Sequence, residues 1–512
     1  MPRDELKNKQ SNRSNKQHKS ESPFNRKSPL DISKRLKEER YLSLISENSD
    51  LGNFIKIEMD EVLGTVNKVF GGEENIDKRI LSYKIILDIL RNTKREETEE
   101  ALDFLDKIFS NTAFLKFADV MLSEDFQLGM KLSSIIVLLH KNTKEWETIK
   151  ALKYFDELFS NKIFPKYAKQ FLSIIENIIE NTEGRETINA FDVINEFISN
   201  PVFLQHMSKL LRVVEEIIKN TKGKETVDTL NSLKNLISNE TFSQYADKLL
   251  SEDFQLGANI YNIIGLIYRN TDQGLQREDA IKYFNNTLLK SVFPSHASTF
   301  FSLIKYVSEK KVGWEMRETL KYIDETPYGL IPQHYIKKLL LIIKGIVEYT
   351  EKWETGWSLD QFNALISNKI FNEYAGKLFT VVEEIIKTAR GYEIKETLEA
   401  ISKLISNKAF LEYADIILVD DFKLGLRLYN IVRSIHQHTE GWLTKEALNY
   451  FNKILYSSML RFDILLDVLE RISKNYVNSD SLSKLFRINI LSENSSGELS
   501  KLCLEKIIEL CM

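Results

Sequence analysis

The chain has 512 residues, 28% of them charged and 43% apolar, with a formal net charge of −4. This composition is typical of a soluble globular chain, and no apolar run approaches the length of a membrane-spanning helix. The two cysteines, Cys503 and Cys511, are too few for a disulfide framework or a cysteine-based metal cluster. Because the N-terminus lacks an apolar signal region, we expect an intracellular protein, cytoplasmic or, in a eukaryote, nuclear.

Residues 1–40 differ in composition from the rest of the chain. They contain twelve Lys or Arg and six Asp or Glu, a net charge of +6, which leaves −10 for the remaining 472 residues. A segment so poor in large apolar side chains cannot bury enough surface to become ordered, so we predict a disordered basic tail over 1–40. Its plainest role is that of a solubilising arm. Its charge also makes nucleic acid, anionic lipid or an acidic protein a candidate ligand.

A repeat of 39 residues runs through residues 41–478. Its most recognisable part ends in Tyr-Ala, as in LFSNKIFPKYA from Leu158, LISNETFSQYA from Leu236 and LISNKIFNEYA from Leu365. Three repeats are longer than the others by 11 or 12 residues. The position of the Asn in these stretches, called the marker position below, counts ten repeats: Gly72, Asn111, Asn161, Asn200, Asn239, Lys290, Gly329, Asn368, Asn407 and Ser457.

Each repeat begins with a predicted helix, here called helix A. Apolar residues recur at helical spacing, as in Ala190, Phe191, Ile194 and Phe197, so one stripe of the helix faces a core. The marker position that follows is Asn six times and Gly twice. Both residues enter the left-handed backbone conformation at low cost, so we predict a left-handed stop at the end of helix A.

A second predicted helix, helix B, follows the marker position. Pro165 and Pro294 suit its first turn, and a strongly apolar run follows the Tyr-Ala step. Helix B ends at a recurrent stop such as Asn181-Thr182-Glu183-Gly184, in which we interpret the glycine as a C-terminal cap. Each helix should contain roughly 13 to 18 residues and be about 20–27 Å long.

A helical hairpin of this kind buries both of its faces only when neighbouring hairpins stack on it. The predicted fold is therefore all-α: an α-solenoid of about ten helical hairpins. In repeat length and two-helix layout, residues 55–478 resemble the armadillo and HEAT class of helical repeats. The resemblance implies a groove lined by the helix B series, and it carries over no functional residue. Residues 479–512 are expected to form C-terminal capping helices after a last helix B over 462–476.

The three long repeats share an insert, which reads LSEDFQLG from Leu122 and from Leu250, and LVDDFKLG from Leu418. Ser123 and Ser251 are suitable N-cap residues, so we predict that helix B breaks here into a short helix and a longer one. The insert is either a spacer that changes the local curvature or an acidic and aromatic element that contacts a partner. In the second interpretation the partner-binding residues are Asp125, Phe126, Asp253, Phe254, Asp421 and Phe422.

The sequence contains no pattern of a catalytic, nucleotide-binding or zinc site. His436 and His438 are two positions apart on a helix and do not share a face, so they are not expected to bind a metal together. We therefore expect neither an enzyme nor a cofactor or metal site.

Two functions fit a solenoid. The first is a protein-interaction scaffold or adaptor that binds another protein on its surface. The alternative is an RNA-binding or single-stranded nucleic-acid-binding helical-repeat protein, which needs a basic groove with stacking side chains. The net charge of −10 outside the tail favours the scaffold, although the basic tail adds a possible electrostatic contact with nucleic acid. The sequence leaves the partner's identity, the binding face and the oligomeric state open.

Overall fold

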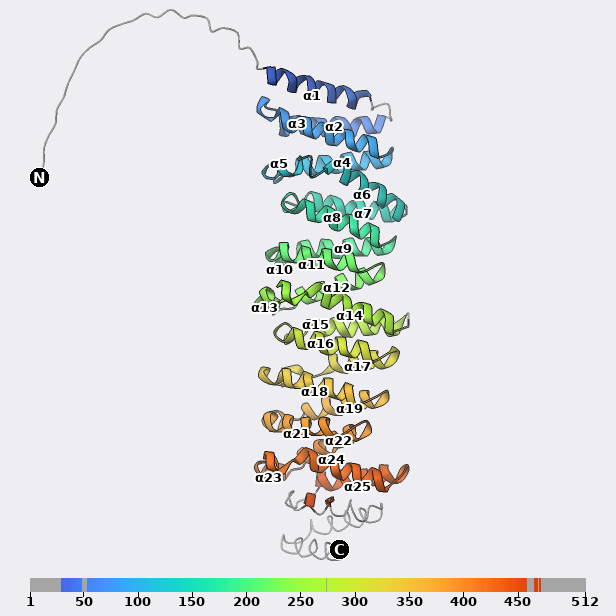
Figure 1. The fold of residues 1–512 in the computed structure, drawn as a ribbon, viewed down its shortest axis with the longest axis vertical. Coiled ribbons are helices and arrows are strands. Elements are labelled where there is room, and N and C mark those ends of the chain that lie inside the picture. The colour runs from blue at the N-terminus through green and yellow to red at the C-terminus, as the bar shows by residue number, and fades with distance from the viewer. Residues whose placement is uncertain (1–28, 48–52, 273, 458–464, 468, 471–512) are drawn as a thin grey trace, which may run out of the picture. The chain divides into compact units, whose positions relative to one another are not determined.

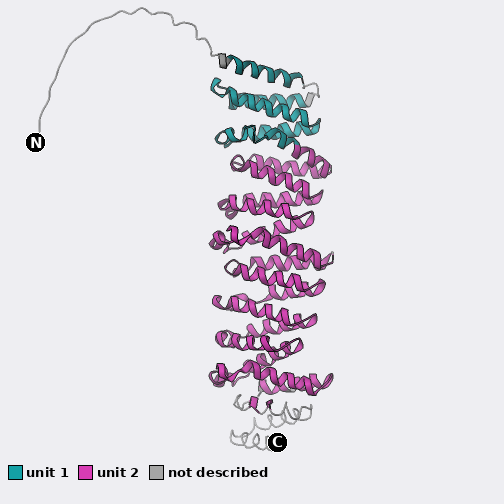
Figure 2. Cartoon of the chain, in the orientation of Figure 1, with its two compact units in different colours: residues 1–133 teal, residues 134–512 magenta. Residues whose placement is uncertain are grey.

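The computed structural model describes residues 29–47, 53–272, 274–457, 465–467 and 469–470. These residues form 25 α-helices and six short 3-10 helices, without a strand among them, so the predicted all-α class is confirmed for this part of the chain. The chain divides into two compact units, residues 1–133 and 134–512 (Figure 2). None of the helices in the described ranges is long and apolar enough to cross a membrane.

Unit 1 contains α1 (Pro29–Glu47), α2 (Asn53–Val69), α3 (Ile76–Asn92), α4 (Glu96–Ser110), α5 (Ala118–Met121) and the start of α6 (Leu128–Asn142), with 3-10 turns η2 (Glu73–Asn75) and η3 (Phe114–Lys116). Helix α1 packs on α3, and α2 packs on α4.

Helix α1 includes residues 29–40, the last part of the predicted tail. Arg79 of α3 explains why these residues are ordered, because its Nε donates to Glu38 at 2.6 Å and its Nη1 donates to the carbonyls of Phe70 and Gly72. Three charges of this segment are paired, because Lys34 and Arg35 also form ion pairs, with Asp77 and Glu73. Residues 1–28 lie outside the described residues, as do 479–512.

Unit 2 is built from two rows of helices in which each helix packs on the next of its own row (Figure 1). The helix A row is α7 (Glu145–Phe159), α9 (Arg185–Ser199), α12 (Lys224–Ile237), α15 (Leu275–Leu289), α17 (Gly313–Glu325), α19 (Trp353–Ile366), α22 (Tyr392–Ile405) and α25 (Trp442–Ser457). The helix B row is α8 (Phe164–Asn181), α11 (Met207–Asn220), α14 (Leu256–Asn270), α16 (Phe293–Lys310), α18 (Ile336–Tyr349), α21 (Ala375–Thr388) and α24 (Leu424–His438). The chain thus forms an array of helical repeats, as its periodicity predicts.

Short helices precede several members of the helix B row: α10 (Pro201–Gln205), α13 (Phe242–Leu249), α20 (Lys369–Glu373) and α23 (Phe410–Ile417). The remaining 3-10 turns are η4 (Glu252–Phe254), η5 (Tyr328–Leu330), η6 (Gln333–Tyr335) and η7 (Asp420–Phe422).

In four repeats the recurrent Tyr position is a bend in helix B, whereas Tyr245 and Tyr413 lie within the short helices α13 and α23. His206 and Tyr374 separate a short helix from a long one, and Tyr167 and His296 have non-helical backbone angles within α8 and α16. The apolar stripe resumes after the bend, as in Phe171, which is fully buried.

The marker asparagines are not left-handed. Asn111, Asn200 and Asn368 have φ values of −62°, −83° and −73° with extended ψ, so the predicted left-handed stop is wrong. At all six asparagines, Oδ1 instead accepts a hydrogen bond from the backbone N–H two residues later, at 2.8–3.1 Å. This side-chain turn satisfies an amide at the start of helix B.

The turn from helix B to the next helix A has its own recurrent hydrogen bond. Helix α8 ends at Asn181, and the hydroxyl of Thr182 bonds to the carbonyl of Ile178 and lies 3.0 Å from the hydroxyl of Thr187. Gly184 has a φ of 52° and is the N-cap of α9, so it begins helix A and does not cap helix B. Equivalent hydroxyl pairs, 2.7–3.0 Å apart, are Thr93/Thr98, Thr143/Thr148, Thr221/Thr226, Thr350/Thr355 and Thr439/Thr444.

Candidate functional site around the middle insert

All three inserts interrupt helix B, as predicted: α5 and α6 flank the first, α13 and α14 the second, and α23 and α24 the third. The interruption ends at a residue with a left-handed backbone, Gln127, Gln255 or Lys423, with φ values of 53°, 48° and 48°. In each insert a glycine lies two positions after this residue. In unit 1 this glycine is required by packing, because a Cβ on Gly129 would lie 2.6 Å from the carbonyl oxygen of Ile85.

The insert serines do not cap the following turn, contrary to the prediction. The hydroxyl of Ser123 donates to the carbonyl of Val120 at 2.7 Å, and that of Ser251 donates to the carbonyl of Lys248 at 2.8 Å. Each hydroxyl therefore satisfies the end of the short helix before the break.

The six predicted partner-binding residues have unequal surroundings. Asp125, Asp253 and Asp421 are exposed, whereas Phe126 is buried, and Phe254 and Phe422 are half-buried. The Phe422 ring is covered by the guanidinium of Arg427, which lies 4.6 Å from its centroid. Only the middle pair, Asp253 and Phe254, lines one of the two cavities described next.

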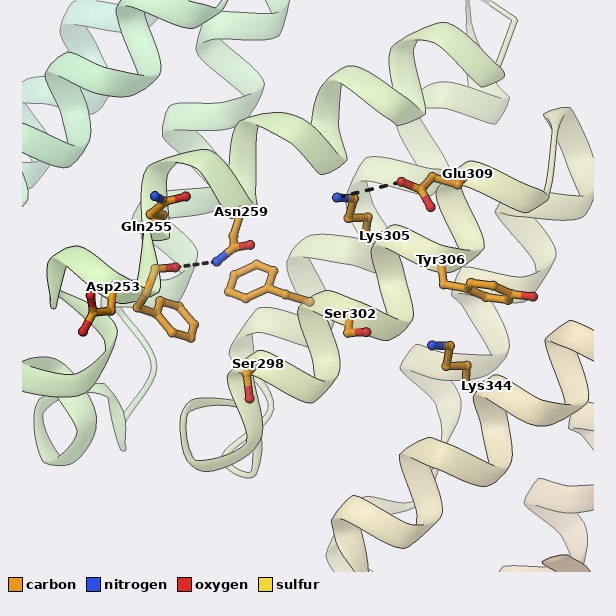
Figure 3. Close-up of a pocket in the computed structure, with 11 residues that line it drawn as sticks. Asp253, Gln255, Asn259, Ser298, Ser302, Lys305, Tyr306, Glu309 and Lys344 are labelled. Carbon is orange, nitrogen blue, oxygen red and sulfur yellow. Dashed lines mark hydrogen bonds and ion pairs between the residues drawn. The ribbon is translucent and has the colours of Figure 1, made fainter.

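A cavity of about 540 Å³, here called the insert cavity, lies between the middle insert and the next helix B, α16. Asp253, Phe254, Gln255 and Asn259 contribute from the insert and the start of α14, while Lys344 contributes from α18 (Figure 3). The side chains from α16 are Ser298, Phe301, Ser302, Lys305, Tyr306 and Glu309.

The apolar wall of the insert cavity is formed by two phenylalanines. The rings of Phe254 and Phe301 are tilted, with centroids 6.0 Å apart. The carbonyl of Phe254 accepts a hydrogen bond from Nδ2 of Asn259 at 2.7 Å, which fixes the insert on the first turn of α14 (Figure 3). The wall is therefore held by a bond within the repeat itself.

The polar groups of the insert cavity carry both signs of charge. Lys305 Nζ lies 3.9 Å from Glu309 Oε1, and Lys344 Nζ lies 5.0 Å from the centroid of the Tyr306 ring. Burial, together with the nearby Glu348 and Tyr349, raises the pKa of Tyr306, so its phenol remains a hydrogen-bond donor at neutral pH. The cavity thus offers two ammonium groups, two carboxylates and a phenol around an aromatic wall.

A smaller cavity of about 210 Å³ lies on the other side of the same insert, against α11. Arg212 Nη1 lies 3.7 Å from Glu252 Oε1 at its edge, and burial raises the pKa of Glu216 in its lining. Gln255, the left-handed residue, lines both cavities. One partner surface placed on the insert would therefore contact both cavities.

Sequence reasoning found two of the residues of the insert cavity and missed the others. Ser298 and Ser302 leave room for the cavity on α16, and the equivalent residues of α18 are Lys337 and Leu341. On α21 the equivalent residues, Gly376 and Thr380, are about as small, so the size of this pair alone does not mark the cavity. The contributions of Lys344 and Tyr306 depend on the packing of successive repeats, which no local pattern shows.

The two histidines of the His-x-His pair bind separate partners, as their spacing predicts. His436 Nε2 is hydrogen-bonded to Oε2 of Glu396, which raises the pKa of His436, whereas His438 Nδ1 lies 2.7 Å from the carbonyl oxygen of Ser434. Across the described ranges, three or more His, Cys, Asp or Glu do not come together in a group that could hold a metal ion. Cys503 and Cys511 lie outside these ranges.

In comparisons with known proteins, the chain matches no family model and no curated protein sequence.

Proposed function

We propose that this chain is a non-enzymatic protein-interaction scaffold with an armadillo- or HEAT-like architecture, and that a partner protein binds its helix B row at the middle insert. The observation that supports this proposal is the insert cavity, where an exposed insert, an aromatic wall and paired charges occur together. Protein interfaces concentrate binding energy in desolvated pockets that receive an anchor side chain, with polar groups at the rim.

A partner protein suits the middle insert better than a small ligand does. Two cavities flank one insert and share Gln255, so the recognised surface extends over three successive members of the helix B row, α11, α14 and α16. The carboxylate of Asp253 is exposed and has no cationic partner among the described residues. It can therefore pair with a basic side chain of a partner at the rim.

Nucleic acid is the competing ligand, and the charges of the insert cavity do not favour it. Channels that bind single strands combine stacking platforms with a net positive groove. Here Asp253 and Glu309 balance Lys305 and Lys344. A phosphate backbone would gain little from a balanced set of charges.

The test compares variants of the full-length chain as baits in a native lysate, with captured proteins quantified by mass spectrometry. Phe254→Ala removes the aromatic wall, and Ser302→Trp fills the insert cavity. Phe422→Ala is the matched control, because this ring has the same place in the third insert and lines neither cavity. We expect one discrete partner to be reduced about tenfold or more by the first two variants, which is the loss of one anchor contact.

The control should retain this partner, and nuclease treatment should leave capture by the unmodified chain unchanged. Equal capture by all three variants would place the interaction elsewhere on the molecule. Captured nucleic acid that disappears at higher salt would favour the competing function. Circular dichroism of each variant checks that its helices are intact.

A further inference from the structure

All five tryptophans of the chain lie in the first two turns of a helix A. They are Trp146 on α7, Trp314 on α17, Trp353 and Trp357 on α19, and Trp442 on α25. Trp353 and Trp357 are 57% and 45% exposed, and Tyr392 at the start of α22 is 46% exposed. Aromatic side chains of this size usually bury most of their surface, so their exposure at one recurrent place in the repeat needs a reason.

Four of these rings form a continuous row, here called the aromatic row: Trp314, Trp353, Trp357 and Tyr392. Their successive centroids are 4.1 Å, 6.5 Å and 5.8 Å apart, with interplanar angles of 31°, 25° and 38°. The row spans three successive members of the helix A row, α17, α19 and α22. It lines neither of the two cavities described above.

The cations nearest to the aromatic row are mostly engaged. Lys311 is buried and pairs with Glu315 at 2.7 Å, and Lys395 pairs with Glu399 at 3.1 Å. The guanidinium of Arg390 lies over the ring of Tyr349, 4.0 Å from its centroid. These cations have little charge left to offer a ligand.

Several carboxylates beside the row lack such partners. Glu351 and Glu354 flank Trp353, Asp360 follows Trp357 by one turn, and Glu393 is adjacent to Tyr392. None of these four forms an ion pair with a described residue, although Glu393 interacts electrostatically with His436. Three nearby lysines, Lys310, Lys352 and Lys387, likewise have no ion-pair partner among the described residues, so the unpaired carboxylates outnumber the unpaired lysines by one. The surface of the aromatic row is therefore aromatic and negatively charged.

We propose that the aromatic row docks an extended, arginine-containing basic segment of a partner protein. Guanidinium groups lie flat on aromatic faces, which attract cations most strongly when the ring is an indole. The unpaired carboxylates beside each ring then neutralise the bound cations. The same carboxylates repel a phosphate backbone, so the row selects a basic peptide and not nucleic acid. Because the row shares no residue with the insert cavity, this proposal holds or fails independently of the proposed function.

The test measures the affinity of a fluorescein-labelled nona-arginine peptide for the full-length chain by fluorescence anisotropy. We expect Trp353→Ala to weaken binding about tenfold or more, because it removes the central ring of the row. Trp146→Ala is the matched control: Trp146 is also 57% exposed at the start of a helix A and has no ring neighbour in the described residues. It should leave the affinity unchanged.

Charge reversal tests the carboxylates while keeping the rings. The double variant Glu351→Lys/Glu393→Lys should also weaken binding about tenfold or more, and the control Glu145→Lys/Glu183→Lys, which changes the net charge equally, should not. A nona-lysine peptide should bind more weakly than nona-arginine, since ammonium groups cannot stack on the rings.

Four results would overturn the proposal. The first is equal binding by the Trp353→Ala and Trp146→Ala variants. The second is a dimer in light scattering that Trp353→Ala dissociates, since the row would then hold a second copy of the chain. The third is binding of a poly-uridine RNA that Trp353→Ala abolishes. The fourth is peptide binding only after the eight Lys and Arg of residues 1–28 are changed to Gln, because the chain's own N-terminal segment would then occupy the row.

Discussion

Helix A begins, in most repeats, next to a residue with positive φ and strongly negative ψ. Gly184, Gly223 and Gly391 have this conformation, with φ of 52°, 55° and 54°. Arg95 and Lys352 occupy the same position without being glycine, with φ/ψ of 42°/−108° and 49°/−127°. For a residue with a Cβ this conformation costs of the order of 1–3 kcal/mol, so both positions store strain.

Replacing Arg95 by glycine should stabilise the protein. Glycine adopts this turn without steric cost, whereas its larger unfolded-state entropy takes back part of the gain, so we expect a net increase of about 1 kcal/mol in the free energy of unfolding. Urea denaturation followed by circular dichroism measures the change. Arg95→Ala keeps the Cβ and is the control, for which we expect no gain. If the alanine variant gained as much as glycine, the arginine side chain and not the backbone would be the source of the strain.

At the scale of the element, the marker asparagines connect helix A to helix B and, in some repeats, one repeat to the next. Asn239 is buried; its Oδ1 accepts from the N–H of Thr241, and its Nδ2 donates to the carbonyls of Leu288 and Lys290 at 2.8 and 2.9 Å. The Oδ1 of Asn200 makes the local bonds to Val202 and Phe203, and no bond of its Nδ2 is seen to the described residues. The same residue type therefore makes different contributions in different repeats.

Glycine substitutions separate these contributions. Asn239→Gly should lower the free energy of unfolding by about 2–3 kcal/mol, because it leaves the buried carbonyl of Leu288 and the part-buried carbonyl of Lys290 without their donor. Asn200→Gly should cost only a few tenths of a kcal/mol, the usual difference between the two residues at an N-cap. Chemical denaturation of both variants measures this. A left-handed stop would instead tolerate glycine equally well at both positions, so equal and small losses would restore the interpretation that the structure contradicts.

Some features of single helices could be predicted from the sequence, and others could not. The stripes of α8 and α9 are visible as residue spacing and are buried as predicted, since burial of a stripe is a property of one helix. The αL assignment at Asn111 failed because Asn and Gly share a backbone preference while Asn alone has a side chain that caps. Asn200-Pro201 contained the signal, since an N-cap followed by proline at the first helical position is typical of a helix start.

At the scale of the whole molecule, the candidate site and the aromatic row depend on neighbours and not on single repeats. The insert predicted Asp253 and Phe254, but Lys344 comes from α18, two members further along the helix B row. Each Trp of the aromatic row is visible in the sequence, yet the 4.1 Å distance between Trp314 and Trp353 follows from the packing of α17 on α19. Contacts between side chains of different repeats depend on how the repeats pack, and the period of 39 residues does not specify that packing.

The same dependence on neighbours predicts how unit 2 responds to damage. Phe362 of α19 is fully buried, and α19 packs mainly on α17, α18 and α22. Phe362→Ala should lower the free energy of unfolding by about 3–5 kcal/mol, as other truncations of a buried phenylalanine do.

In an array stabilised by nearest-neighbour interfaces, this loss of stability stays local. Hydrogen exchange measured by mass spectrometry should therefore rise in these four helices and remain unchanged in α8 and α9. Phe191→Ala on α9 is the matched control, for which the rise should instead occur in α9 and in α7, α8, α10 and α12, the helices that pack on it. A uniform rise across unit 2 for both variants would mean that the repeats unfold as one cooperative block, and the interfaces between repeats would then be stronger than the repeats themselves.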